Sequence, residues 1–224
     1  MKKSGLLFLL LVFAISRSIA QSKMIVDQKP GLTSFGGSTV WVDSISQLPP
    51  QIFNNLKPIM EKFMGDFYPK VHFVYGQEID LENNDYVPKD GSKISPWIPK
   101  YDLEFTLKDV SIGIKSLPIN IRFDKNGKLL KFTWPRAGFE NNSKFISRDT
   151  IRAVALRIAD SLKFNKEKYE VDFNYDENKQ KFTWIFLFPA ADSAVNHYTF
   201  NTIEINWVDR NDYKIDKLRR DIVY

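Results

Sequence analysis

The chain has 224 residues, a formal net charge of +5 and no cysteine, and it is rich in aromatic residues, with 18 Phe, 9 Tyr and 5 Trp. The lack of cysteine excludes disulfides, thiol catalysis and cysteine-ligated metal sites, so packing alone must hold the fold together. Lys2, Lys3 and Arg17 lie in an N-terminal segment that we expect to be removed, which leaves 29 basic against 27 acidic residues. So small and dispersed a positive charge argues against binding to nucleic acid.

Residues 1–20 have the pattern of a signal peptide. Two lysines precede an unbroken apolar run of ten residues, Leu6–Ile15, and Ser18-Ile19-Ala20 is a small-x-small cleavage site. Such a run is too short to cross a bilayer, although a short membrane anchor is the alternative. We therefore expect a secreted or periplasmic protein with no membrane span after signal removal, and secretion without disulfides favours bacterial export.

The remaining chain is long enough for one large domain or two small ones. Residues 21–45 are rich in Gly, Ser and Thr and are predicted to be irregular, apart from a short edge strand at Thr39–Val42. Residues 46–135 form the first predicted unit. Its helix begins at Pro49-Pro50, which suit a first turn, and Pro58 either kinks it or delays its start. The apolar residues of this helix follow helical spacing and are Ile52, Leu56, Ile59, Met60, Phe63 and Phe67.

Alternating apolar and polar residues then predict four strands, at 71–75, 101–107, 117–123 and 130–134. Asn126-Gly127 suits a tight turn with positive φ before the last of them. The connection 76–100 is long, acidic and rich in proline, as functional or mobile loops often are. We expect this loop to be the contact surface for a partner. Trp97, flanked by prolines, either binds a ligand or partner there or tucks onto the core.

Residues 145–224 form the second predicted unit. Its helix, Ser147–Leu162, has Ser147 as the expected N-cap and Asp149 in the first turn. The apolar face of the helix consists of Ile151, Val154, Ala155, Ile158 and Leu162. Strand patterns follow at 169–173, 182–188, 203–207 and, as a short last strand, 213–218. Because both units repeat the order helix, three strands, turn and short strand, we predict an α+β fold of two helix-on-antiparallel-sheet units in tandem, related by duplication.

Three features of the second unit occur together in a known family: the helix Thr150–Leu162, the strand pair around Tyr169-Glu-Val and Phe182-Thr-Trp, and the hydrophobic-x-hydrophobic-x-x-x-Asp ending of Ile203–Asp209. In these features the unit resembles the PepSY-like domains of exported bacterial proteins. The family's Thr-Gly or Asp-Gly turn is replaced here by Asp209–Asp212, and the first unit matches only loosely. The resemblance implies a non-catalytic module that binds or inhibits a peptidase or another envelope protein, and it implies no active-site residues.

Catalytic and cofactor motifs are missing from the sequence. There is no G-x-S-x-G elbow, P-loop, dinucleotide fingerprint or H-E-x-x-H pair, and we expect His72 and His197 to be structural or surface residues rather than zinc ligands. The carboxylates of the loop 76–100 do not have the spacing of a calcium loop. Glu78 and Asp80 as the acid–base pair of a carbohydrate hydrolase form the weakest hypothesis. We expect no enzyme, no cofactor and no metal.

The alternating run Phe182, Trp184, Phe186 and Phe188 has two interpretations. It forms plain core, or Trp184 and Phe186 line an apolar pocket between helix and sheet. Two functions follow. We predict a non-catalytic protein that binds an envelope or secreted protein, with a peptidase among the candidates, and the alternative is a carrier of a small apolar ligand.

Overall fold

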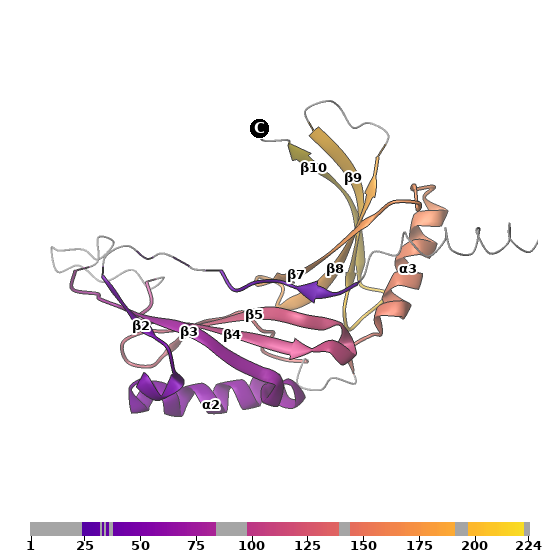
Figure 1. The fold of residues 1–224 in the computed structure, drawn as a ribbon. Coiled ribbons are helices and arrows are strands. Elements are labelled where there is room, and N and C mark those ends of the chain that lie inside the picture. Colours follow the sequence, from indigo (N-terminus) through magenta and orange to yellow (C-terminus); the bar gives the residue numbers. More distant parts are fainter. Residues whose placement is uncertain are drawn as a thin grey trace, which may run out of the picture. The chain divides into compact units, whose positions relative to one another are not determined.

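A computed structural model describes residues 24–31, 33, 35, 38–83, 98–138, 144–190 and 197–221, and for residues 197 and 221 it describes the backbone alone. Over these residues the protein has two sheets and few helices, so the α+β class of the predicted fold is confirmed (Figure 1). The chain divides into two compact units. The N-terminal unit comprises Ile25–Arg148 with Asn174–Thr183, and the C-terminal unit comprises Asp149–Phe173 with Trp184–Tyr224, to which the N-terminal segment up to Met24 is also assigned. The proposed signal peptide, residues 1–20, and Trp97 lie outside the described residues.

The N-terminal unit is built on a six-stranded sheet in the order β1-β5-β4-β3-β2, with β6 pairing with β5 as well. Its strands are β1 (Val26–Asp27), β2 (Thr39–Val42), β3 (Val71–Ile79), β4 (Tyr101–Asp109), β5 (Ile114–Phe123) and β6 (Leu129–Phe132). All pairs are antiparallel except β1 with β5. The edge strand expected at Thr39–Val42 is confirmed as β2.

Helix α2 (Pro50–Met64) lies along one face of this sheet (Figure 1). It begins with Pro50 in the first turn, as predicted, and runs on through Pro58. Phe67, which the helical spacing includes, lies beyond α2, because Gly65 at φ 48° ends the α-helix and Phe67 belongs to the 3-10 helix Gly65–Lys70. The residues of α2 that pack on the sheet at every fourth position are Ile52, Leu56, Met60 and Met64.

Trp134 closes the C-terminal end of α2. Its Nε1 donates to the carbonyl oxygen of Phe63 at 3.0 Å, and its ring is fully buried 5.3 Å from that of Phe67. The last carbonyls of a helix have no partner inside the helix, so this bond satisfies one of them. Through Trp134, the segment that follows β6 is therefore fixed to the C-terminal end of α2 within the core of the unit.

Two features of β3 differ from the prediction. The strand continues through Gly76–Ile79, so the expected loop 76–100 begins four residues too early, and residues 84–97 of that loop lie outside the described residues. The register also shifts between Phe73 and Tyr75, which leaves Val74 as an extra residue. Such a bulge puts Phe73 and Tyr75 on opposite faces of the sheet, although simple alternation places them on one face.

The second sheet is antiparallel and four-stranded, in the order β10-β9-β8-β7, and it is accompanied by α3 (Arg148–Ser161). Its strands are β7 (Glu170–Asp176), β8 (Lys181–Pro189), β9 (His197–Asn206) and β10 (Tyr213–Asp221). These elements belong to the C-terminal unit except for Arg148 and residues 174–183, the end of β7 and the start of β8, which belong to the N-terminal unit. The last strand is not short, since it pairs with β9 along all nine of its residues. On α3 the predicted face is correct for Ile151, Val154 and Ala155, whereas Leu162 lies beyond the helix and is 42% exposed.

Candidate functional site

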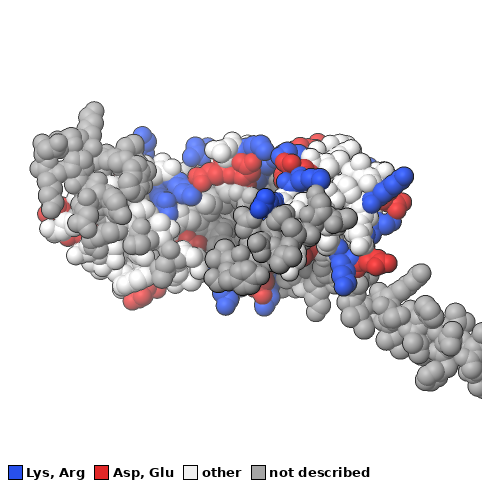
Figure 2. Space-filling view, turned by 90° about the horizontal axis from the view of Figure 1, so that it is seen from above, with Lys and Arg blue, Asp and Glu red and all other residues white. Residues whose placement is uncertain are grey.

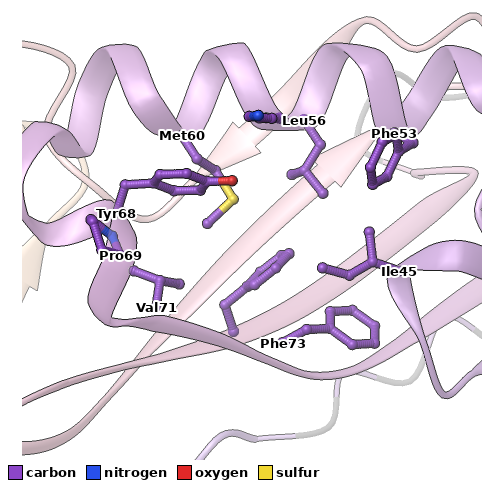
Figure 3. A pocket seen from close by; sticks show the side chains of 10 residues that line it. Ile45, Phe53, Leu56, Met60, Tyr68, Pro69, Val71 and Phe73 are labelled. Atoms are coloured by element: carbon purple, nitrogen blue, oxygen red, sulfur yellow. The ribbon is translucent and has the colours of Figure 1, made fainter.

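An apolar pocket of about 290 Å³ lies between α2 and the sheet of the N-terminal unit (Figure 3). Its roof is made by Phe53, Leu56 and Met60 of α2. Its floor is made by Phe73 of β3 and Phe105 of β4, whose ring centres are 5.3 Å apart. The volume is at the lower end of the range for ligand sites, so the pocket suits a small molecule.

Local structure explains why this space stays open. The spacing of Phe53, Leu56 and Met60 brings three side chains of α2 onto one face, above β3. The turn that follows α2 places Tyr68 and Pro69 at one end of the pocket, and the short 3-10 helix Ile45–Gln47 closes the other end. Side chains from these two turns thus bound the pocket at its two ends.

Two polar groups accompany the apolar walls. The hydroxyl of Tyr68 points into the pocket towards Leu56, and it has no hydrogen-bond partner among the described residues (Figure 3). Lys57 also lines the pocket, and its Nζ is 3.8 Å from Glu61 in an exposed ion pair. Phe53 is 45% exposed and forms the rim. The pocket therefore suits a ligand with an apolar body and one polar, acceptor-bearing end.

The aromatic residues predicted to line a pocket lie elsewhere. Trp184 and Phe186 are fully buried in the C-terminal unit. The ring centre of Trp184 is 4.8 Å from that of Phe173 and 5.9 Å from that of Trp207, while Tyr169 is 6.0 Å from Phe186. These rings pack on one another as a core does, although the Nε1 of Trp184 is buried without a hydrogen-bond partner in the described structure. A ligand role for Trp184 and Phe186 stays a prediction.

Sequence reasoning missed the pocket under α2, although parts of it were visible. The predicted helical face includes Leu56 and Met60 of the roof but not Phe53, and the predicted strands include both floor residues. The 3-10 turn at Tyr68-Pro69 and the bulge at Val74 were not predicted, and these two features decide which side chains face the pocket. The sequence predicts Phe73 and Phe105 as strand residues and indicates no space beside them.

The acidic pair considered for hydrolysis is engaged in other bonds. Glu78 forms an ion pair with Lys100 at 3.0 Å, and Asp80 accepts from the side chain and backbone of Asn83. The hydrogen bond from the Asn83 side chain is the main reason that the pKa of Asp80 lies below its usual value. His72 is exposed on β3, and the side chain of His197 lies outside the described residues. Within the described ranges, no three His, Asp or Glu side chains gather as a metal site requires.

On the face seen in Figure 2, basic and acidic side chains are interspersed rather than gathered into a broad field of one sign. None of the helices that the structure describes is long and apolar enough to cross a membrane. Comparisons with protein-family models, curated proteins and solved structures found no match.

Proposed function

We propose that this protein is an exported, non-catalytic binding protein that holds a small apolar ligand between α2 and its sheet. The observation that carries the proposal is the pocket of about 290 Å³ with apolar walls and the inward-pointing hydroxyl of Tyr68. A polar group in an otherwise apolar pocket fixes the orientation of a ligand. Tyr68 and Lys57 suit a carboxylate or another acceptor, so a medium-chain fatty acid has the right chemistry.

Binding of decanoate, measured by calorimetry on residues 21–224, tests this proposal. Phe53→Ala removes the rim of the pocket and is expected to weaken decanoate binding several-fold. Leu162→Ala is the matched control, because Leu162 is a similarly exposed apolar residue that follows the other helix. Equal affinity of both variants and the wild-type chain for decanoate, or no binding at all, contradicts the proposal. Native mass spectrometry of the purified protein shows in parallel whether a lipid co-purifies.

A partner protein is the second candidate function, and the surface of the C-terminal sheet favours it. The edge strand β10 carries Tyr213, Ile215 and Leu218, all exposed, and Tyr198 of β9 is exposed as well. A sheet edge with apolar side chains is a common site for the addition of a partner's strand. An envelope peptidase with an extended segment is such a partner. Replacement of Ile215 and Leu218 by Lys should abolish its capture from envelope extracts and leave decanoate binding unchanged.

The PepSY-like relationship and the tandem duplication belong to this proposal. They are supported by the order of elements, since α2 is followed by the antiparallel series β3–β6 and α3 by β7–β10. Export is supported by the sequence of residues 1–20. Mass analysis of the protein from the periplasm tests it, because cleavage after Ala20 leaves Gln21 as the first residue.

A further inference from the structure

On the face of the N-terminal sheet opposite α2, strand β4 carries polar residues that are buried. Asp102, Glu104 and Thr106 alternate with the apolar residues of β4 and are only 7%, 5% and 6% exposed. Buried carboxylates are rare unless each has a partner of opposite charge. Three consecutive polar positions on one face of a central strand therefore require an explanation.

Asp102 has such partners. Its carboxylate accepts from Nε of Arg122 at 2.9 Å and from Nδ2 of Asn120 at 2.6 Å. Arg122 also donates to the hydroxyl of Thr33 at 3.1 Å, and its guanidinium lies 4.8 Å from the ring centre of Phe35. The charge of Asp102 is thus balanced by a cation that is itself held in place.

Glu104 has no cationic partner among the described residues. Its carboxylate accepts one hydrogen bond, from Nδ2 of Asn120 at 3.1 Å on the directly opposite position of β5. Lys131, the other cation nearby, forms an ion pair with Glu177 at 3.1 Å. A buried carboxylate with one neutral donor is an unstable arrangement on its own.

A cavity of about 340 Å³ adjoins this carboxylate. Glu104 and Asn120 line it together with Tyr175, and Leu117, Pro118 and Phe182 supply apolar wall. Two buried polar atoms here have no hydrogen-bond partner in the described structure, Oδ1 of Asn120 and the hydroxyl of Tyr175. The cavity therefore presents an unpaired carboxylate, a free carbonyl oxygen and a free hydroxyl.

We propose that this cavity binds a small organic cation through its primary ammonium group, which is held by Glu104 and Asn120. An ammonium carries three donors, and the cavity offers three acceptors: the carboxylate of Glu104, Oδ1 of Asn120 and the hydroxyl of Tyr175. An anion is disfavoured, because both cations that line the cavity already have carboxylate partners. The apolar wall accommodates a short alkyl chain.

Protonation of Glu104 competes with the cation. Burial raises the pKa of Glu104 to about 7, opposed by the hydrogen bond from Asn120 and the charges of Arg122 and Lys131, while Asp102 raises it further. The phenols of Tyr75 and Tyr175 stay neutral in this range, since burial raises the pKa of each. Glu177, the remaining carboxylate at the cavity, is paired with Lys131. An ammonium ligand therefore binds more tightly as pH rises through about 7.

The test uses n-butylammonium as the probe and 1-butanol as its neutral counterpart, with binding followed by NMR on residues 21–224. Near pH 8 the ammonium should bind and shift the Asn120 side-chain resonances, whereas butanol should not. Lowering the pH to about 6 should weaken binding about tenfold, because the ionised fraction of Glu104 falls by that factor. Glu104→Gln should weaken it at least tenfold near pH 8.

Two further variants make the outcome specific. Tyr175→Phe removes one acceptor and should weaken butylammonium binding a few-fold, while Glu170→Gln changes an exposed carboxylate of the C-terminal unit and should have no effect. Butylammonium binding that is unchanged in Glu104→Gln, equal binding of butanol, or no binding near pH 8 overturns the proposal and assigns the cavity to water. Phe53→Ala should leave butylammonium binding intact, so this proposal is tested independently of the proposal for the apolar pocket.

Discussion

Glu104→Gln should stabilise the N-terminal unit, and the gain should depend on pH. The pKa of Glu104 is raised from 4.5 to about 7 in the folded protein, so between these values the folded state binds more protons than the unfolded state. The free energy of unfolding must then fall as pH rises from about 4.5 to about 7 and level off above that range. The difference of 2.5 pKa units corresponds to about 3 kcal/mol at most. Glutamine keeps the acceptor for Asn120 but cannot ionise, so the free energy of unfolding of the variant should not fall in this way as pH rises.

Urea unfolding read by hydrogen exchange is the suitable assay, because peptides from β4 and β5 report on the N-terminal unit alone. The stability of the Gln variant should equal that of the wild-type protein near pH 4.5 and exceed it by up to about 3 kcal/mol near pH 8. Glu170→Gln, which affects an exposed ion pair with Arg220, should change the free energy of unfolding by less than about 1 kcal/mol at any pH. A wild-type stability that does not fall between these two pH values would refute the argument.

Three further substitutions test the packing and the apolar pocket. Trp134→Phe removes the donor to the Phe63 carbonyl and should lower the free energy of unfolding by about 1–3 kcal/mol, measured in urea. Gly76→Ala places a methyl group 2.7 Å from Cδ2 of the fully buried Leu103 and should cost about 1–3 kcal/mol in the same assay. Tyr68→Phe should weaken decanoate binding a few-fold and leave stability within about 0.5 kcal/mol, and an unchanged affinity would remove Tyr68 from the site.

The sequence patterns predicted where helices and strands occur better than which strands pair with one another. The start of α2 follows from Pro50, whose fixed φ suits a first turn, and β4 follows from strict alternation. The parallel pairing of β1 with β5 has no local signal, because it joins segments almost ninety residues apart. The bulge at Val74 has none either, since it depends on how β3 meets β4.

The buried polar residues of β4 show that sequence patterns have the same limit when they are used to predict binding sites. Asp102, Glu104 and Thr106 have the alternation of a half-exposed strand, which normally places polar residues in water. They are buried because other segments cover them, among them the segment with Thr33 and the end of β7 that contains Tyr175. Which segment covers a face is a tertiary property, so the sequence pattern alone did not distinguish this cavity from a solvated surface.

We expect a buried carboxylate that lowers the stability of the free protein to have a role in the ligand-bound protein. If an ammonium ligand pairs with Glu104, it should recover part of the stability that ionisation removes. Binding to the folded state alone stabilises it by RT ln(1 + [L]/Kd), which is about 1.4 kcal/mol at a ligand concentration ten times Kd. Near pH 8, butylammonium should therefore raise the urea midpoint of the wild-type N-terminal unit and not that of Glu104→Gln. An equal rise in both proteins would mean that the amine stabilises the protein by binding elsewhere on its surface. Ligand binding would then not compensate for the stability that ionisation of Glu104 removes.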